Sequence, residues 1–184
     1  LGRVFQDPMT GTAATMGIEE NLALAKRRGK TRLLKPGITK KEREEYKELL
    51  KVLGLGLENR LTSKVGLLSG GQRQALTLLM ATMVTPKILL LDEHTAALDP
   101  ATAAKVLALT RQIIAERKIT ALMVTHNMHQ ALELGNRTLM MDAGSIIFDV
   151  SGAEREKLTV DDLLEKFKEN AGRQLDNDRI LTSK

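Results

Sequence analysis

The hydrophobic positions divide the chain into a mostly helical first half and a second half in which strands and helices alternate. Apolar residues recur at helical spacing over residues 16–25 and 39–53. The second stretch is strongly amphipathic, with Thr39 as a suitable N-cap and Gly54 as a stop, so it predicts a well-defined helix. Residues 1–5 are apolar enough to form the end of a strand.

The second half predicts an α/β arrangement. ILLLDE at 88–93 and ITALMV at 119–124 are too short for helices, and their continuous apolar character predicts buried strands. Helical patterns surround them, at residues 72–84, 101–117 and 127–134. Because strands that alternate with helices usually build a parallel sheet, we expect an α/β fold with a largely parallel sheet.

The C-terminal part predicts a hairpin followed by a last helix. Residues 138–142 and 145–149 are two short strand-like segments joined by Ala143-Gly144. Thr159, with Asp162 three residues later, forms the start signal of a helix. Residues 171–184 are polar, and we expect them to be frayed.

Composition excludes several classes of protein. The 184 residues suit one ordinary domain with a small subdomain, and 42% hydrophobic with 28% charged residues is a globular balance. The absence of Cys excludes a disulfide framework and a thiolate metal site. No run of about 18 apolar residues predicts a membrane-spanning helix, and residues 1–20 lack the pattern of a signal peptide.

The formal net charge of +5 comes mainly from a basic cluster within residues 26–43. Such a cluster can meet nucleic acid or anionic lipid, although a solvated helix face is the commoner case. Aromatic residues make up only 2% of the chain, whereas single-strand binders stack bases on several aromatic rings. We therefore expect no nucleic-acid partner.

The strongest sign of chemistry is LLSGGQRQALTLLMATMVTPKILLLDEHTAALD at 67–99, together with VFQDP near the start and VTHN at 124–127. Ser69, Gly70 and Gly71 precede a predicted helix, so their backbone N–H groups and the helix dipole favour an anion such as a γ-phosphate. The alternative is an ordinary glycine turn in which Ser69 is the helix N-cap.

An acidic pair ends the first apolar strand. Asp92 and Glu93 lie where α/β folds place ligands; Asp92 suits Mg²⁺, and Glu93 suits orienting or deprotonating a water. The alternative is a pair that caps the next helix. His126 ends the second apolar strand, where a lone histidine is often structural. His94, His126 and His129 lack the spacing of a metal site such as H-E-x-x-H.

Taken together, these segments resemble the nucleotide-binding subunits of ABC transporters. LSGGQ at 68–72 resembles the family signature, ILLLDE its Walker B strand, and AALD at 96–99 its D-loop. Gln6 resembles the Q-loop glutamine and His126 the switch histidine. The segments follow the family's order and spacing over nearly the whole chain.

The resemblance implies a P-loop NTPase-like ABC ATPase core, incomplete here, with an α-helical signature subdomain. It also implies ATP hydrolysis coupled to transport, with ATP and Mg²⁺ as cofactors. Glu93 would be the base, and Asp92 would hold Mg²⁺. Gln6 and His126 would contact the γ-phosphate and the water, and Gln6 would also reach Mg²⁺. The residues implied to bind nucleotide are Ser69, Gly70, Gly71, Gln72 and Asp99. Asp99 would lie at a dimer seam, and its alternative role is to cap the helix that follows it.

The resemblance further implies a division into segments and a set of partners. Residues 1–7 would end a core strand and form the Q-loop, and 8–75 would form the helical subdomain. Residues 76–158 would form the α/β core, and 159–184 a C-terminal helix and polar tail. The implied partners are transmembrane permease subunits, a second copy in a homodimer and a substrate-binding protein, at the cytoplasmic face of the cell membrane. An amino-acid-type importer is the subgroup it suggests. The rivals are a soluble ABC-type ATPase acting on nucleic acid or ribosomes, and a degenerate cassette that does not hydrolyse ATP.

The tripeptide Gly29-Lys30-Thr31 imitates the end of a P-loop, G-x-x-x-x-G-K-[ST]. Position 24, where the first glycine belongs, is Leu, and the tripeptide follows a helical stretch instead of a buried strand. It also lies after the Q-loop segment, and Pro36-Gly37 interrupts the helix that should follow. We therefore expect a decoy. The chain would be the C-terminal portion of an ABC ATPase without its Walker A segment, and inactive alone.

Overall fold

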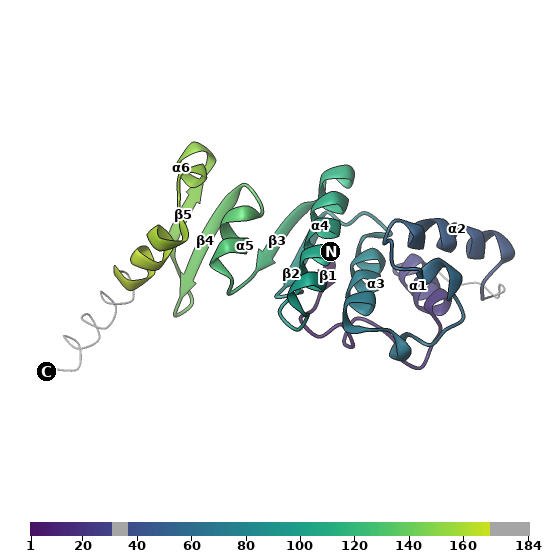
Figure 1. The fold of residues 1–184 in the computed structure, drawn as a ribbon. Helices are drawn as coiled ribbons and strands as arrows, with labels where there is room; N and C mark the ends of the chain where they lie inside the picture. The colour runs from purple at the N-terminus through teal and green to yellow at the C-terminus, as the bar shows by residue number, and fades with distance from the viewer. Residues whose placement is uncertain (31–36, 170–184) are drawn as a thin grey trace, which may run out of the picture. The chain divides into compact units, whose positions relative to one another are not determined.

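The protein is described by a computed structural model that covers residues 1–30 and 37–169. It forms two compact units, Leu1–Val124 and a second unit that begins at Thr125. Figure 1 shows the elements of both.

The first unit contains a three-stranded parallel sheet in the order β1-β2-β3. Its strands are Gly2–Val4, Ile88–Asp92 and Thr120–Val124. The middle strand β2 pairs with both neighbours, so that Leu91 lies opposite Val4 and Asp92 lies opposite Val124. This confirms the predicted parallel sheet and places the acidic end of β2 between two other strand ends.

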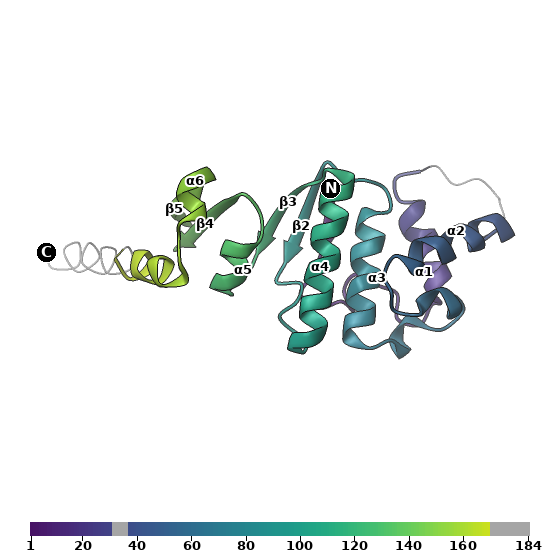
Figure 2. The same ribbon diagram turned by 45° about the horizontal axis from the view of Figure 1, so that its top comes forward.

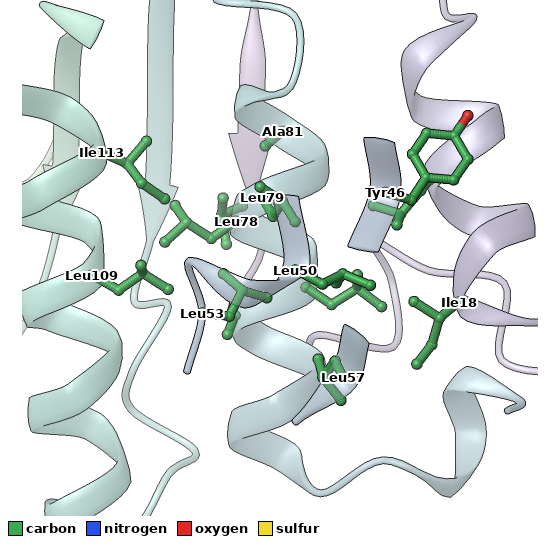
Figure 3. Close-up of a cluster of buried hydrophobic side chains, with 14 of the residues drawn as sticks. Ile18, Tyr46, Leu50, Leu53, Leu57, Leu78, Leu79, Ala81, Leu109 and Ile113 are labelled. Atoms are coloured by element: carbon green, nitrogen blue, oxygen red, sulfur yellow. The ribbon is translucent and has the colours of Figure 1, made fainter. Parts of the chain in front are cut away.

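Helices α3 (Gly70–Thr82) and α4 (Pro100–Arg117) lie side by side in both ribbon views (Figures 1 and 2). Helices α1 (Ile18–Lys26) and α2 (Lys40–Lys51) pack on the far side of α3, with short 3₁₀ helices at Leu57–Asn59 and Val65–Leu67. Side chains from these helices meet in one hydrophobic core, part of which is drawn in Figure 3. The two 3₁₀ helices were not predicted.

Two helix boundaries show how the caps set the ends. Thr39 caps α2, since its hydroxyl accepts a hydrogen bond from the Glu42 N–H at 3.2 Å, and Gly54 at φ 62° follows the helix, as expected. Helix α3 begins at Gly70, earlier than the predicted residue 72, because Ser69 and Gln72 form a capping box.

The segments 88–93 and 119–124 were predicted to be buried strands, and the prediction of burial is only partly right. In β2, Leu89 and Leu91 are buried, whereas Ile88 is 44% exposed. In β3 it is wrong, since Leu122 is 52% and Val124 is 53% exposed. The physical reason is that the buried residues of β2 belong to the hydrophobic core of the helices, which covers one face of the sheet. In the described part of the chain, β3 is moreover an edge strand that pairs with β2 alone.

The second unit contains α5 (Met128–Glu133), an antiparallel hairpin of β4 (Arg137–Asp142) and β5 (Ser145–Ser151), and α6 (Gly152–Glu156). The hairpin was predicted, and its turn residues Ala143 and Gly144 both have positive φ, as two-residue hairpin turns require. α6 was not predicted.

The last predicted helix is confirmed over residues 160–169. Its start signal works as expected, because the Asp162 N–H donates to Thr159 Oγ1 at 3.2 Å and Asp162 Oδ2 accepts from the Thr159 N–H at 2.7 Å. The tail expected to fray, 171–184, lies outside the described residues. Among the described helices, none combines the length and the apolar character that crossing a membrane demands.

Candidate functional site

The carboxylate of Asp92 lies at the C-terminal end of the central strand β2. Arg3 Nη2 on the neighbouring strand β1 donates to Asp92 Oδ2 at 2.9 Å, and the Arg3 guanidinium also lies 4.5 Å from the centre of the Phe5 ring. The Arg3 and Asp92 side chains are 50% and 43% exposed, so the ion pair contributes about 1 kcal/mol at most. Sequence reasoning missed Arg3, although its register partner Leu90 lies two residues before Asp92 and hence on the same face.

Glu93 follows directly, with a backbone held in an uncommon conformation. Its φ is 42°, in the left-handed region that residues other than Gly rarely adopt. Its N–H donates to the Val124 carbonyl at 3.0 Å, and its own carbonyl accepts from the Ala96 N–H at 2.9 Å. These bonds join the end of β2 to the end of β3 and close a tight turn after Glu93.

His94, inside that turn, is buried. Its side chain is 2% exposed, and Nε2 lies 3.1 Å from Thr110 Oγ1 on α4. Burial lowers the pKa of His94 to about 4, so its ring is neutral near pH 7. The sequence offered no reason to expect this contact.

The signature residues occupy the start of α3. Ser69 is exposed and caps the helix, as the alternative interpretation held, while Gly70 and Gly71 form the first helical residues. Gly71 is buried at a close approach between helices, because a Cβ there would meet Thr102 Cγ2 of α4 at 2.0 Å. The Gln72 side chain is already used in the capping box.

Asp99 caps the neighbouring helix α4, as its alternative role predicted. Its Oδ1 accepts from the Thr102 N–H at 3.0 Å, and hydrogen bonds from the Thr102 side chain and backbone lower the pKa of Asp99. Because Thr102 also touches Gly71, the start of the signature helix and the start of the D-loop helix lie together.

Gln6 is exposed, just beyond the end of β1. The carbonyl of the preceding residue, Phe5, accepts a hydrogen bond from Gln74 Nε2 at 3.1 Å. Gln74 is 1% exposed and belongs to α3, so the segment that follows β1 is attached to α3. Sequence reasoning missed Gln74; a glutamine within the apolar part of the helix pattern was the available signal.

His126 belongs to the second unit, where it is exposed. The adjacent residues fix its loop: the Asn127 N–H donates to Thr125 Oγ1 at 3.0 Å, and the Gln130 N–H donates to Asn127 Oδ1 at 3.2 Å. The Asn127 bond caps α5. These bonds lie within the second unit, and a joint role of His126 with the acidic pair stays a prediction.

The described residues include side chains of the type that binds Mg²⁺, but they do not form a complete metal site by themselves. Over residues 1–30 and 37–169, no three or more His, Cys, Asp or Glu side chains gather closely enough to hold a metal ion. The Asp92 carboxylate and the Gln6 amide oxygen are hard ligands that suit Mg²⁺, which commonly takes its other ligands from phosphate and water. They fit an ion that arrives with a nucleotide.

The P-loop imitation follows a helix, as expected. α1 ends at Lys26, and Gly29 at φ 74° comes after it. Thr31 and Pro36 lie outside the described residues. A hollow of about 450 Å³ lies near α1 and the start of α2, lined by Met16, Glu19, Glu20, Ala23, Leu24, Arg27, Gly37, Ile38 and Arg43. None of the motif residues lines it.

Comparison with known proteins places these features in one family. The tyrosine transport ATP-binding protein of Clostridioides difficile (strain R20291) is 48% identical over 167 residues, which cover 91% of this chain and 66% of that protein. The methionine import ATP-binding protein MetN of Clostridium tetani (strain Massachusetts / E88) is 43% identical over 103 residues, 56% of this chain and 32% of that protein. The chain thus spans between about a third and two thirds of these relatives' lengths.

Solved structures agree on the fold. An ATP-binding cassette of an ABC transporter in its ADP conformation matches with a TM-score of 0.69 and 26% identity, covering 90% of this chain and 67% of that one. CbiO1 from Clostridium perfringens, part of the ABC transporter complex cbiONQ, matches with a TM-score of 0.67 at 24% identity, over 94% of this chain and 64% of that one. The predicted α/β cassette fold is therefore confirmed. The sequence profile described as ABC transporter matches residues 1–96, from β1 to the turn after the acidic pair, and the chain belongs to the ABC transporter family.

Proposed function

We propose that this chain belongs to an ATP-hydrolysing subunit of an ABC importer for amino acids. The observation that carries the proposal is the acidic pair at the end of the central strand, in the same unit as the capped starts of the signature and D-loop helices. The names of two relatives, which refer to tyrosine transport and methionine import, support an amino acid as the transported substrate.

In this proposal the acidic pair divides the work. Asp92 and Gln6 hold Mg²⁺, and the ion, when bound, neutralises charge that develops on the phosphates. Glu93 accepts a hydrogen bond from the attacking water and takes its proton as the water oxygen attacks the γ-phosphate. His126 and Gln6 contact the γ-phosphate and the water. Because Arg3 donates to Asp92 Oδ2, the ion would take Asp92 Oδ1 or share Oδ2 with Arg3.

The signature residues would serve a second copy of the subunit. The N-terminus of α3, where Ser69 and Gly70 are exposed, would face the γ-phosphate of nucleotide held by the partner copy, with Gly71 and Gln72 in the same first turn. Asp99, at the neighbouring helix start, would then lie near the seam of a homodimer. We further propose that permease subunits and a substrate-binding protein complete the transporter, and that this subunit works at the cytoplasmic face of the cell membrane. The same proposal divides the chain into the core strand and Q-loop (1–7), the helical subdomain (8–75), the α/β core (76–158) and the C-terminal helix and tail (159–184).

The phosphate cradle is not expected within these 184 residues, because Gly29-Lys30-Thr31 lacks the P-loop pattern. Equilibrium dialysis of the purified chain with Mg-ATP tests this. We expect no binding at millimolar nucleotide, with Glu93→Gln as the non-hydrolysing control. Tight binding would show that the dismissal of this tripeptide is wrong.

The decisive experiment measures ATP turnover of the transporter isolated from cells in which its ATP-binding subunit carries these residues. Glu93→Gln should abolish turnover and keep nucleotide binding, whereas Glu48→Gln, at a side chain that is 69% exposed on α2, should preserve both. Unchanged turnover in Glu93→Gln would refute the proposed mechanism. Isolation with ribosomes or DNA instead of a permease would favour the soluble ABC-type ATPase.

A further inference from the structure

The turn that follows Glu93 is attached to the middle of α4 by one buried side chain. His94 is the second residue of the turn that the Ala96 N–H closes on the Glu93 carbonyl at 2.9 Å. Its Nε2 lies 3.1 Å from Thr110 Oγ1, and His94 and Thr110 are 2% and 4% exposed. Water therefore competes little for this hydrogen bond.

The neighbours of Thr110 determine the direction of the bond. Thr110 Oγ1 donates to the Val106 carbonyl at 2.8 Å, and a carbonyl can only accept. The single proton of the Thr110 hydroxyl is thereby used. The hydroxyl oxygen must accept from His94, so His94 carries its proton on Nε2.

This bond matters because Glu93 is held at a positive φ of 42°. A residue other than Gly keeps such a conformation only when its surroundings enforce it. On one side, the Glu93 N–H is bonded to Val124 at 3.0 Å. On the other side, the next residue of the turn, His94, is joined to α4 through its hydrogen bond with Thr110.

We propose that His94 is a positioning residue whose Nε2–H···Thr110 hydrogen bond holds the turn in the conformation that aims the Glu93 carboxylate. The inference rests on the proposed role of Glu93 as the base. His94 does not touch the reacting atoms; it acts through the backbone of its neighbour.

The geometric part is tested on the chain by nuclear magnetic resonance. The nitrogen spectrum of His94 should show the Nε2–H tautomer. Amide exchange over residues 93–98 should speed up roughly five- to tenfold in His94→Ala and in Thr110→Val, the loss expected for one net hydrogen bond. The double variant should exchange no faster than either single one, and Thr110→Ser, which keeps the hydroxyl, should match the wild type. An Nδ1–H tautomer, or additive effects of the two changes, would overturn the inference.

The catalytic part is tested by ATP turnover of the transporter. His94→Ala should lower kcat about tenfold and leave KM for ATP unchanged, because the change disturbs the base and not the nucleotide contacts. His94→Gln should retain much of the wild-type kcat, since the glutamine side-chain NH₂ group lies about as far from the backbone as Nε2 and can donate to Thr110 Oγ1. His129→Ala, at an exposed histidine of the second unit, should behave as the wild type.

The two proposals fail in different ways. If Glu93→Gln keeps full turnover, the proposed base is wrong. If Glu93→Gln loses turnover while His94→Ala keeps its kcat, Glu93 is the base and the positioning role of His94 is wrong.

Discussion

The contact between Gly71 and Thr102 leads to a sharp prediction about the signature helix. A Cβ at Gly71 would lie 2.0 Å from Thr102 Cγ2. Carbon atoms in contact prefer a separation of about 3.5–4.0 Å, so Gly71→Ala requires a displacement of about 1.5 Å between α3 and α4. Otherwise Thr102 must turn to another rotamer, which would remove its side-chain hydrogen bond to Asp99.

The magnitude follows from two opposing effects. Overpacking of a closely packed position costs about 1–3 kcal/mol, whereas replacing a helical Gly by Ala contributes about 0.5–1 kcal/mol. We expect Gly71→Ala to lower the free energy of unfolding by about 1–2 kcal/mol. Gly70→Ala is the matched control, because its Cβ would meet only Leu98 Cδ2, at 3.4 Å. It should be neutral or stabilising by up to about 1 kcal/mol.

Urea unfolding followed by circular dichroism measures these differences. Gly71→Ala should unfold at a lower urea concentration than Gly70→Ala. Thr102→Ser removes the methyl group that clashes and keeps the hydroxyl, so the Gly71→Ala/Thr102→Ser double variant should recover the stability of Thr102→Ser alone. The reasoning is refuted if Gly71→Ala is as stable as Gly70→Ala, or if the double variant shows no recovery.

Three further predictions concern other contacts. Arg43 donates to the Glu19 carboxylate at 2.6 and 2.8 Å and thereby lowers the pKa of Glu19. This ion pair stabilises the fold above the ordinary pKa of a glutamate, and the stabilisation is lost as pH falls through the lower pKa of Glu19 in the folded protein. Glu19→Gln should therefore flatten the acid side of a curve of Tm against pH. Arg155→Met should destabilise the second unit by about 2–3 kcal/mol, seen as faster amide exchange in α5, because its guanidinium donates to three carbonyls at the end of that helix. Leu91→Ala should cost about 2–5 kcal/mol in urea unfolding, whereas Leu122→Ala, at a 52% exposed position, should change stability by about 0.5 kcal/mol or less.

Local signals in the sequence indicated the helix caps, although Ser69 and Asp99 were caps only in the alternative interpretation and α3 begins two residues before its predicted start. Thr39, Ser69 and Asp99 each accept the N–H of the third residue that follows them. Such a cap depends on residues within one turn of the chain, so its sequence pattern contains nearly all the information needed. The same holds for the Ala-Gly turn of the hairpin, where the residue types and the positive φ angles agree.

The contacts that shape the candidate site could not be predicted in this way. His94 reaches Thr110, sixteen residues later, and Gln74 reaches the Phe5 carbonyl across 69 positions. Gln74 stands out only as a polar residue in an apolar stretch of helix, and nothing in the local sequence names its partner or that of His94. Only the packing of α4 and α3 against the sheet determines which polar groups are enclosed together and must satisfy each other.

In β3, the sequence pattern and the observed burial differ. Its run ITALMV is apolar on both faces, which is typical of a parallel strand covered on both sides. In the described part of the first unit, the helices bury the side of β2 that carries Leu89 and Leu91, while Leu122 and Val124 on β3 stay exposed. The hydrophobic pattern of a strand indicates the environment that suits the strand. Its actual burial depends on which other elements pack against it. For this reason the order of strands and helices was predictable, but the exposure of β3 required the structure.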